Sequence, residues 1–353
     1  YKSFSEAPIV LPPALLPSPR FQELLSSPLN PILAICLPLL IPPPISQNLH
    51  FSFPISKMDR PRFVIPASEV ESMAEESNLS VLQFLPSLVN SAKRLARPPI
   101  SHYHVGAVGL GSSGRVFLGV NLEFPNLPLH HSVHAEQFLL TNLSINAEPH
   151  LRYLAVSSAP CGHCRQFLQE IRNAPNINLL ITSEPKSESD QFQPLSSFLS
   201  HRFGPDDLLA KDVPLLLEPH HNGLTFLSET QFPSCNGFSD GYEELRYAAL
   251  EAANKSHAPY SRCPSGVALM DGEGKVYKGS YTESAAYNPS LGPVQAAIVA
   301  YVTGGDGGGY DKIVAAVLVE KEGAVVKQED TARLLLKAIS PKCGLKVFHC
   351  SSA

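Results

Sequence analysis

Residues 105–123 read VGAVGLGSSGRVFLGVNLE. Two apolar runs flank Gly-Ser-Ser-Gly, which is typical of a β-hairpin with strands at 104–110 and 115–121. Apolar periodicity predicts the surrounding elements, which are helices beginning near 68 and 86, a helix over 133–143, a strand over 151–157, a helix over 161–173 and a strand over 177–182. Helices alternating with strands in this way indicate an α/β sandwich built on a mixed sheet.

The same pattern occurs a second time further along the chain. Three pairs of segments match, namely 105–108 (VGAV) with 265–268 (SGVA), 119–123 (GVNLE) with 279–283 (GSYTE), and 133–136 (VHAE) with 294–297 (VQAA). We therefore expect a duplicated fold. The predicted organisation is a disordered proline-rich extension over 1–57, a catalytic domain over 58–183, a linker over 184–239 and a degenerate copy over 240–353.

The two copies share their apolar positions but not their chemically special residues. In the segment matches above, His134 becomes Gln295 and Glu136 becomes Ala297, and no cysteine pair lies near 320–324. Residues that one copy lacks are not needed to make the fold. The chemistry is therefore expected in the first copy alone.

The motifs His134-Ala135-Glu136 and Pro160-Cys161-Gly162-His163-Cys164 carry this chemistry. A catalytic zinc takes three protein ligands and keeps a fourth position for water, and one imidazole with two thiolates makes such a set. Cys161 and Cys164 are three residues apart at the start of a predicted helix, so both sulfurs point to one side. We predict zinc at His134, Cys161 and Cys164, with Glu136 beside it.

Other interpretations of these residues remain open. Cys-x-x-Cys at a helix start also occurs in disulfide oxidoreductases, although a redox dithiol leaves Glu136 unexplained. A structural zinc site needs a fourth protein ligand, for which His163 is the candidate. The neighbouring His130 and His131 are expected in a surface loop.

With these motifs the chain resembles the cytidine deaminase family, in its two-domain homodimeric form, over about residues 68–350. The pairing of H-x-E with P-C-x-x-C is the signature of zinc-dependent deaminases that act on bases. The resemblance implies a duplicated three-layer α/β/α sandwich with a mixed sheet and a degenerate second copy. It also implies that His134, Cys161 and Cys164 bind Zn²⁺, that Glu136 transfers protons, and that two chains form a homodimer.

The resemblance extends to the substrate site. Asn121 and Glu123 match the family's ribose-binding N-x-E motif, and Tyr103 stands where related sequences carry a phenylalanine that stacks on the pyrimidine. Phe203 opens the family's F-G-P-x-D-L segment, which in relatives reaches or approaches an active site of the partner chain. Asparagine at a strand end is often a turn former, and Glu123 recurs as Glu283, so structural roles for both stay open.

Composition limits the partners of this chain. A formal net charge of -5 and a pI near 6.2 give no basic field to attract nucleic acid or an anionic membrane. The apolar stretch 29–45 is interrupted by prolines and is too short to span a bilayer. Seven cysteines, an odd number in a long chain, favour a reducing compartment, and we expect a cytoplasmic protein.

These features predict hydrolytic deamination of free cytidine and deoxycytidine to uridine and deoxyuridine, with release of ammonia, in pyrimidine salvage. Two alternatives stay open. A polynucleotide cytidine deaminase acting on RNA or single-stranded DNA would need a basic groove with aromatic platforms. A non-catalytic nucleoside-binding protein would need no intact metal site.

Overall fold

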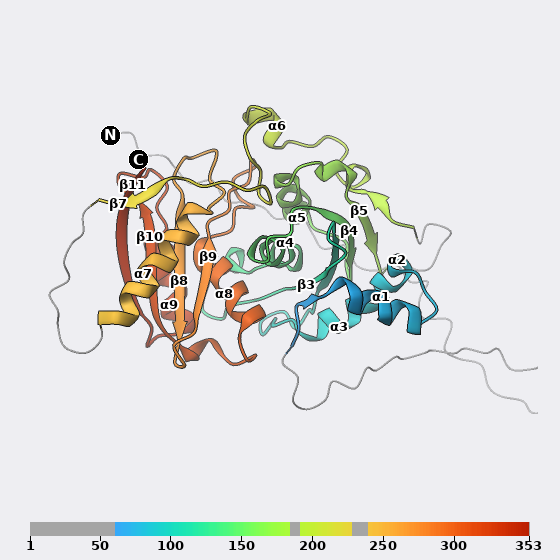
Figure 1. Cartoon of the computed structure of the whole chain (residues 1–353), viewed down its shortest axis with the longest axis horizontal. Helices are drawn as coiled ribbons and strands as arrows, with labels where there is room; N and C mark the ends of the chain where they lie inside the picture. Colours follow the sequence, from blue (N-terminus) through green and yellow to red (C-terminus); the bar gives the residue numbers. More distant parts are fainter. Residues whose placement is uncertain (1–60, 184–190, 228–238, 353) are drawn as a thin grey trace, which may run out of the picture. The chain divides into compact units, whose positions relative to one another are not determined.

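Two mixed β-sheets, one from each predicted copy, organise the chain (Figure 1). The computed structural model describes residues 61–183, 191–227 and 239–352, all within the unit Ser56–Ala353. The predicted extension over 1–57 lies outside the described residues. Among the described residues, no helix has the length and apolar character needed to cross a membrane.

The first sheet has the strand order β1-β3-β2-β4-β5-β6. Its strands are β1 (Val64–Ile65), β2 (Gly106–Gly111), β3 (Val116–Val120), β4 (Leu151–Val156), β5 (Asn178–Ile181) and β6 (Gln193–Pro194). Only the β4–β5 pair is parallel. The accompanying helices are α1 (Ala67–Glu76), α2 (Val81–Phe84), α3 (Val89–Arg94), α4 (Ala135–Ile145), α5 (Gly162–Phe167) and α6 (Pro205–Leu208).

The second sheet has the order β7-β11-β10-β8-β9. Its strands are β7 (Leu224–Phe226), β8 (Ser265–Asp271), β9 (Val276–Ser280), β10 (Ile313–Lys321) and β11 (Gly344–Ser352), and its helices are α7 (Ser239–Asn254), α8 (Pro293–Gly304) and α9 (Glu329–Ile339). Here β10 and β11 form the parallel pair. The parallel pair occupies the corresponding place in both sheets, which confirms the predicted duplication of a mixed-sheet α/β fold.

Matching glycines allow helices to cover both faces of each hairpin. A Cβ on Gly119 or Gly279 would lie 2.2 or 2.1 Å from backbone atoms of α4 or α8. A Cβ on Gly106 or Gly266 would lie 2.6 or 2.2 Å from the backbone of α3 or α7. Successive strand residues point to opposite faces, so the two glycines of each hairpin serve opposite helices. This arrangement gives the three layers in each copy.

The helices α4 and α8 lie between the two sheets and pack against each other (Figure 1). One buried apolar cluster contains residues of both helices together with the inner faces of both sheets. The two copies therefore share a continuous core, in which residues of one copy pack against residues of the other.

The structure corrects the predicted match between 133–136 and 294–297. Val133 bridges Leu122, and in the second copy Leu291 bridges Thr282 in the same way. The helices then begin after His134 and after Gly292. The connecting loop is two residues shorter in the second copy, so Gly292 corresponds to His134 and Val294 to Glu136. The conclusion that the second copy lacks both residues is unchanged.

Some predicted boundaries also differ. The helix predicted over 161–173 ends at Phe167 and continues only as a 3₁₀ turn over Leu168–Glu170. The helix predicted near 86 begins as a 3₁₀ turn before α3. The expected linker over 184–239 supplies β6 to the first sheet and β7 to the second, while its domain boundaries stay a prediction.

A buried carboxylate holds the turn between β2 and β3. Glu148 is 1% exposed and accepts hydrogen bonds from the Ser112 hydroxyl, from the amide and hydroxyl of Ser113, and from the Arg115 guanidinium at 2.8 Å. Burial opposes ionisation of this carboxyl, but the hydrogen bonds outweigh burial and lower the pKa of Glu148. The ionised form therefore stabilises the fold.

We predict that Glu148→Gln lowers the free energy of unfolding by about 1–3 kcal/mol near neutral pH, because the buried network loses its negative charge and one of its two acceptor oxygens. A carboxyl with a lowered pKa contributes stability above its unfolded pKa and loses it as the pH falls through the folded value. The gap between wild type and variant should stay constant above about pH 5 and shrink below about pH 4. Urea titrations across this range measure it, and a gap that does not depend on pH would contradict the assignment.

Candidate metal centre and active site

The N-termini of α4 and α5 bring the three predicted metal ligands together. His134 is the residue before α4, and Cys161 is the residue before α5. The His134 Nδ1 atom lies 3.5 Å from Cys161 Sγ and 3.2 Å from Cys164 Sγ, and the two sulfurs lie 3.6 Å apart. The three donor atoms form a small triangle.

This triangle fits zinc. Bonds of about 2.3 Å to sulfur and about 2.0–2.1 Å to nitrogen in a tetrahedron place two sulfurs about 3.8 Å apart, and sulfur and nitrogen about 3.6 Å apart. The observed separations are all within about 0.4 Å of these values. Borderline-soft thiolate and imidazole donors are the set that zinc prefers.

The electrostatics of the site favour a thiolate. Hydrogen bonds from the Cys164 thiol and the His134 ring lower the pKa of Cys161 to about 3, although burial acts in the opposite direction. The thiolate is the form of cysteine that binds metal. The site is therefore prepared to hold a cation.

Glu136 lies in the first turn of α4 and is 4% exposed. Burial raises the pKa of its carboxyl, while hydrogen bonding with Cys164 and the charge of His134 oppose that change. A carboxyl shifted toward neutral pH can both accept and return a proton, which is the property of a general acid–base catalyst. The structure thus brings Glu136 beside the predicted ligands.

His163 joins the same cluster. One of its ring nitrogens lies within 4.8 Å of the donor atoms of the three predicted ligands. Its ring centroid is 5.1 Å from that of His134, and its Nδ1 atom is buried without a hydrogen-bond partner. The donors of His134, Cys161 and Cys164 are mutually closer, at 3.2–3.6 Å. The tighter set is the one that leaves a fourth position for water.

Two predicted substrate residues, Asn121 and Tyr103, are linked to each other and to the cysteine loop. The Asn121 amide donates to the Tyr103 carbonyl at 2.9 Å and accepts from the Val105 amide at 2.9 Å. The Tyr103 hydroxyl lies 2.8 Å from the hydroxyl of Ser158, which precedes Cys161 by three residues. The Tyr103 ring remains 59% exposed and is available to a ligand.

Glu123 has a structural role that both copies share. Its Oε2 atom accepts the amides of Ile100 and Ser101 at 2.9 Å, and its Oε1 atom accepts the Ser101 hydroxyl. Glu283 accepts the amides of Tyr260 and Ser261 and the Ser261 hydroxyl in the same way. A carboxylate oxygen has two acceptor positions, so Oε1 of Glu123 can still accept one hydroxyl from a substrate.

Phe203 lies apart from this network. Its carbonyl accepts a hydrogen bond from Gln166 on α5, and its ring is 45% exposed. The backbone of Phe203 is thus held beside the cysteine-bearing helix while its side chain faces outward.

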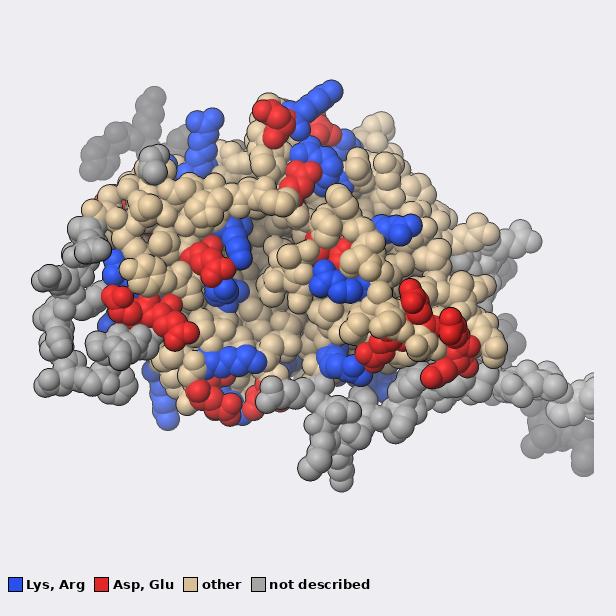
Figure 2. Space-filling view, viewed as in Figure 1, with Lys and Arg blue, Asp and Glu red and all other residues tan. Residues whose placement is uncertain are grey.

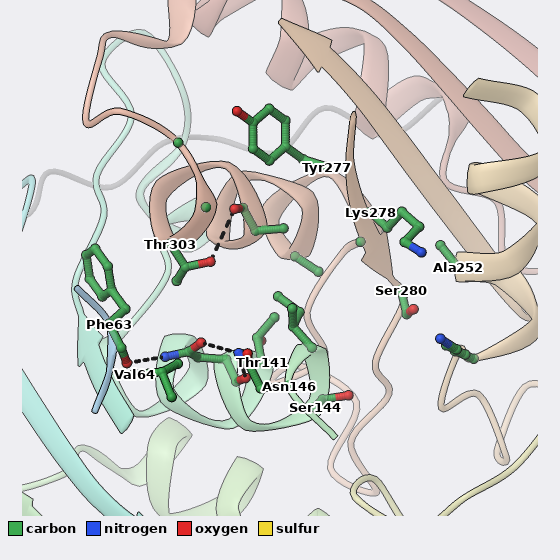
Figure 3. Close-up of a pocket in the computed structure, with 18 of the residues that line it drawn as sticks. Phe63, Val64, Thr141, Ser144, Asn146, Ala252, Tyr277, Lys278, Ser280 and Thr303 are labelled. Atoms are coloured by element: carbon green, nitrogen blue, oxygen red, sulfur yellow. Dashed lines mark hydrogen bonds between the residues drawn. The ribbon is translucent and has the colours of Figure 1, made fainter. Parts of the chain in front are cut away.

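A cavity of about 570 Å³ contains none of the predicted site residues (Figure 3). It lies between the two copies, and Phe63, Thr141, Tyr277 and Lys278 are among the residues that line it. Thr141 is more than one helical turn beyond Glu136 on α4. The cavity is therefore separate from the cluster of predicted metal ligands.

Sequence reasoning missed Gln137 and Glu170. The Gln137 Oε1 atom accepts the His134 amide at 3.2 Å, and its Nε2 atom donates to the Pro289 carbonyl at 2.9 Å. The spacing of His134 and Gln137 follows a capping-box pattern, a signal that the sequence contains. Glu170 is fully buried against the second copy, a contact that local sequence patterns do not reveal.

Comparisons with known proteins identify the family of this chain. Two models described as "Cytidine and deoxycytidylate deaminase zinc-binding region" match residues 80–180 and 195–333. The chain is 63% identical over 303 residues to cytidine deaminase 1 of Arabidopsis thaliana, covering 84% of this chain and 100% of that protein. It is 52% identical over 295 residues to cytidine deaminase 6 of the same plant, covering 82% of this chain and 98% of that protein.

The chain is also 42% identical over 266 residues to a protein named probable inactive cytidine deaminase 4 of Arabidopsis thaliana, with coverages of 75% and 88%. The name of that relative makes the residues of the site worth inspecting in this chain. Here the metal-ligand triangle and the buried glutamate are complete. On this geometry and these similarities, the chain belongs to the zinc-binding cytidine deaminase family.

Proposed function

We propose that this enzyme hydrolyses the 4-amino group of free cytidine and deoxycytidine to give uridine or deoxyuridine and ammonia. The observation that carries the proposal is the convergence of His134, Cys161 and Cys164 with the buried carboxyl of Glu136 in one copy. The catalytic domain in this proposal is the segment 58–183, and the segment 240–353 is non-catalytic.

The proposed roles follow from the positions of the side chains. His134, Cys161 and Cys164 would hold the zinc ion, which when bound makes water acidic enough to supply a nucleophile near neutral pH. Glu136 accepts one proton from the attacking water and delivers it to N3 of the pyrimidine ring, which makes C4 electrophilic as the water oxygen bonds to it. Glu136 then takes the second proton from the new hydroxyl group on C4 and transfers it to the amino group, so that the C4–N bond breaks, the C4=O bond forms and ammonia leaves.

Asn121, Glu123 and Tyr103 are proposed to hold the nucleoside. The exposed Tyr103 ring offers a face for the pyrimidine, and the remaining acceptor position of Glu123 suits a ribose hydroxyl. The carboxylate of Glu123 would repel a phosphate attached to that hydroxyl. This favours free nucleosides over polynucleotides.

Charge distribution supports the same choice. On the face shown in Figure 2, basic and acidic side chains are interspersed and form no continuous basic stripe. The formal net charge of -5 offers no long-range attraction for a nucleic acid. The alternative of an RNA or single-stranded DNA deaminase has no comparable support.

We also infer a homodimer, in which Phe203 contributes near the partner's site. The inference rests on the similarity of the F-G-P-x-D-L segment to that of two-domain relatives. A cytoplasmic enzyme of pyrimidine salvage is consistent with the free thiols of the described cysteines.

Glu136→Gln should retain zinc but lower kcat by about 10²–10⁴-fold, because the amide cannot carry the proton. Cys161→Ser is the matched change on the metal side, and it should lose zinc together with activity. Metal analysis and ammonia release, measured on the same samples, separate the two roles. A Glu136→Gln enzyme within a few-fold of wild type would refute the proton-transfer role.

Wild-type enzyme should show a kcat/KM about 10²–10⁴-fold lower for cytidine 3′-monophosphate and for a short cytidine-containing RNA than for cytidine. Glu123→Gln should raise KM for cytidine and reduce the penalty against the 3′-phosphate. Comparable wild-type values for RNA and cytidine would overturn the proposed substrate class.

Glu283→Gln is the control for this experiment, because Glu283 makes the same three hydrogen bonds in the second copy. It should lower the free energy of unfolding by a similar amount. The kcat/KM values for cytidine 3′-monophosphate and for RNA, each relative to that for cytidine, should stay as in wild type. If the two variants behave alike toward substrates, Glu123 has only its structural role.

A further inference from the structure

We propose that the metal-free copy positions the metal-binding helices of the catalytic copy, and that Glu170 is the main positioning residue of this link. The proposal rests on the proposed assignment of His134, Cys161 and Cys164 as the zinc ligands. It assigns a function to the second copy that a merely degenerate domain would not have.

Glu170 connects the cysteine-bearing segment to the second copy. Its carboxylate is fully buried and accepts the Tyr260 hydroxyl at 2.7 Å and the Ala285 amide at 2.7 Å. The Nε2 atom of His257 lies 3.3 Å from the same carboxylate. All three partners belong to the second copy, and an unpaired carboxylate at this depth would be costly. The second copy is therefore required to satisfy it.

The link between Glu170 and the cysteines is short and stiff. Helix α5 ends at Phe167, and one 3₁₀ turn leads directly to Glu170. Phe167 and Leu168, which lie between Cys164 and Glu170, are fully buried. Close packing transmits a displacement with little loss. Movement at Glu170 therefore shifts the start of α5, where both sulfurs lie.

A second link reaches the histidine ligand. Gln137 accepts the His134 amide at 3.2 Å and donates to the Pro289 carbonyl at 2.9 Å. The same loop of the second copy thus supplies the Ala285 amide to Glu170 and the Pro289 carbonyl to Gln137. One loop contacts both helices that carry metal ligands.

The second copy contacts Glu170 through a turn whose equivalent in the first copy lies beside the proposed substrate residue Tyr103. Glu123 holds the turn at Ile100 and Ser101 beside Tyr103, and Glu283 holds the equivalent turn at Tyr260. In the second copy this turn presents the Tyr260 hydroxyl to Glu170. The second copy keeps this turn but lacks the predicted metal ligands and Glu136, as a positioning role requires.

Tyr260→Phe tests the proposal, because it removes one hydroxyl and keeps the ring. In holoenzyme treated with a chelator, it should release zinc about threefold to tenfold faster than wild type. This is less than the effect of about 10–100-fold on metal affinity that direct partners of metal ligands have, because Tyr260 acts through Glu170. Cobalt-substituted enzyme should show shifted thiolate-to-cobalt and d–d absorption bands. Tyr260→Phe should lower kcat by a larger factor than the factor by which it raises KM.

Tyr277→Phe is the matched control. Its hydroxyl donates to Asp271 at 2.7 Å, so Tyr277→Phe removes a hydrogen bond that lies within the second copy and does not involve Glu170. The control should lower the melting temperature by a similar amount and leave zinc release and the cobalt spectrum at wild-type values. Glu170→Gln should resemble Tyr260→Phe, and the double variant should be no worse than Glu170→Gln alone.

Two failures can be distinguished. If wild-type enzyme binds no zinc at these residues, the proposed metal site itself is wrong. If wild type binds zinc and Tyr260→Phe matches Tyr277→Phe in zinc release and cobalt spectrum, the contact of Glu170 is only structural and the proposal is overturned.

Discussion

The constraint on which the site depends is the meeting of two helix N-termini within a few ångströms of each other. His134 and Cys161 each precede a helix. The distance of 3.5 Å between His134 Nδ1 and Cys161 Sγ is therefore set by where α4 and α5 begin. Glycines without Cβ atoms let α4 lie directly on β3, and the core shared with α8 holds α4 from the other side. A metal with bond lengths near 2 Å tolerates little error in these positions. Metal binding therefore depends on how precisely these helices are packed.

The duplication shows which features the fold needs and which the reaction needs. Glycines, hairpins and the turn-holding glutamates occur in both copies. In the second copy Gly292 replaces the ligand His134, and the Gln295 side chain lies 2.4 Å from where a Cβ on Gly292 would be. Val294 fills the position of Glu136 and is buried. Histidine at 292 alone would therefore not rebuild a metal site.

Much of this could be predicted from the sequence, because the controlling signals are local. The hairpins, the central helices and the convergence of the predicted ligands His134, Cys161 and Cys164 follow from short motifs with clear periodicity. The loop before α8 is two residues shorter than its counterpart before α4, and the sequence comparison missed this. Matching 133–136 with 294–297 compares residue types, whereas the true correspondence depends on how the strands pair. The edge strands β1, β6 and β7 are two or three residues long and carry too little pattern to detect. The role of Glu170 depends on partners far away in the chain, which no local pattern contains.

In the arrangement that we propose, one copy carries a three-ligand zinc site while the other supports it. Zinc analysis combined with zinc K-edge X-ray absorption tests this most directly. We expect one zinc per chain, with two sulfurs at about 2.3 Å, one imidazole nitrogen at about 2.0 Å and one further light atom. Two zincs per chain, or a second imidazole contributed by His163 in a closed four-ligand set, would contradict it.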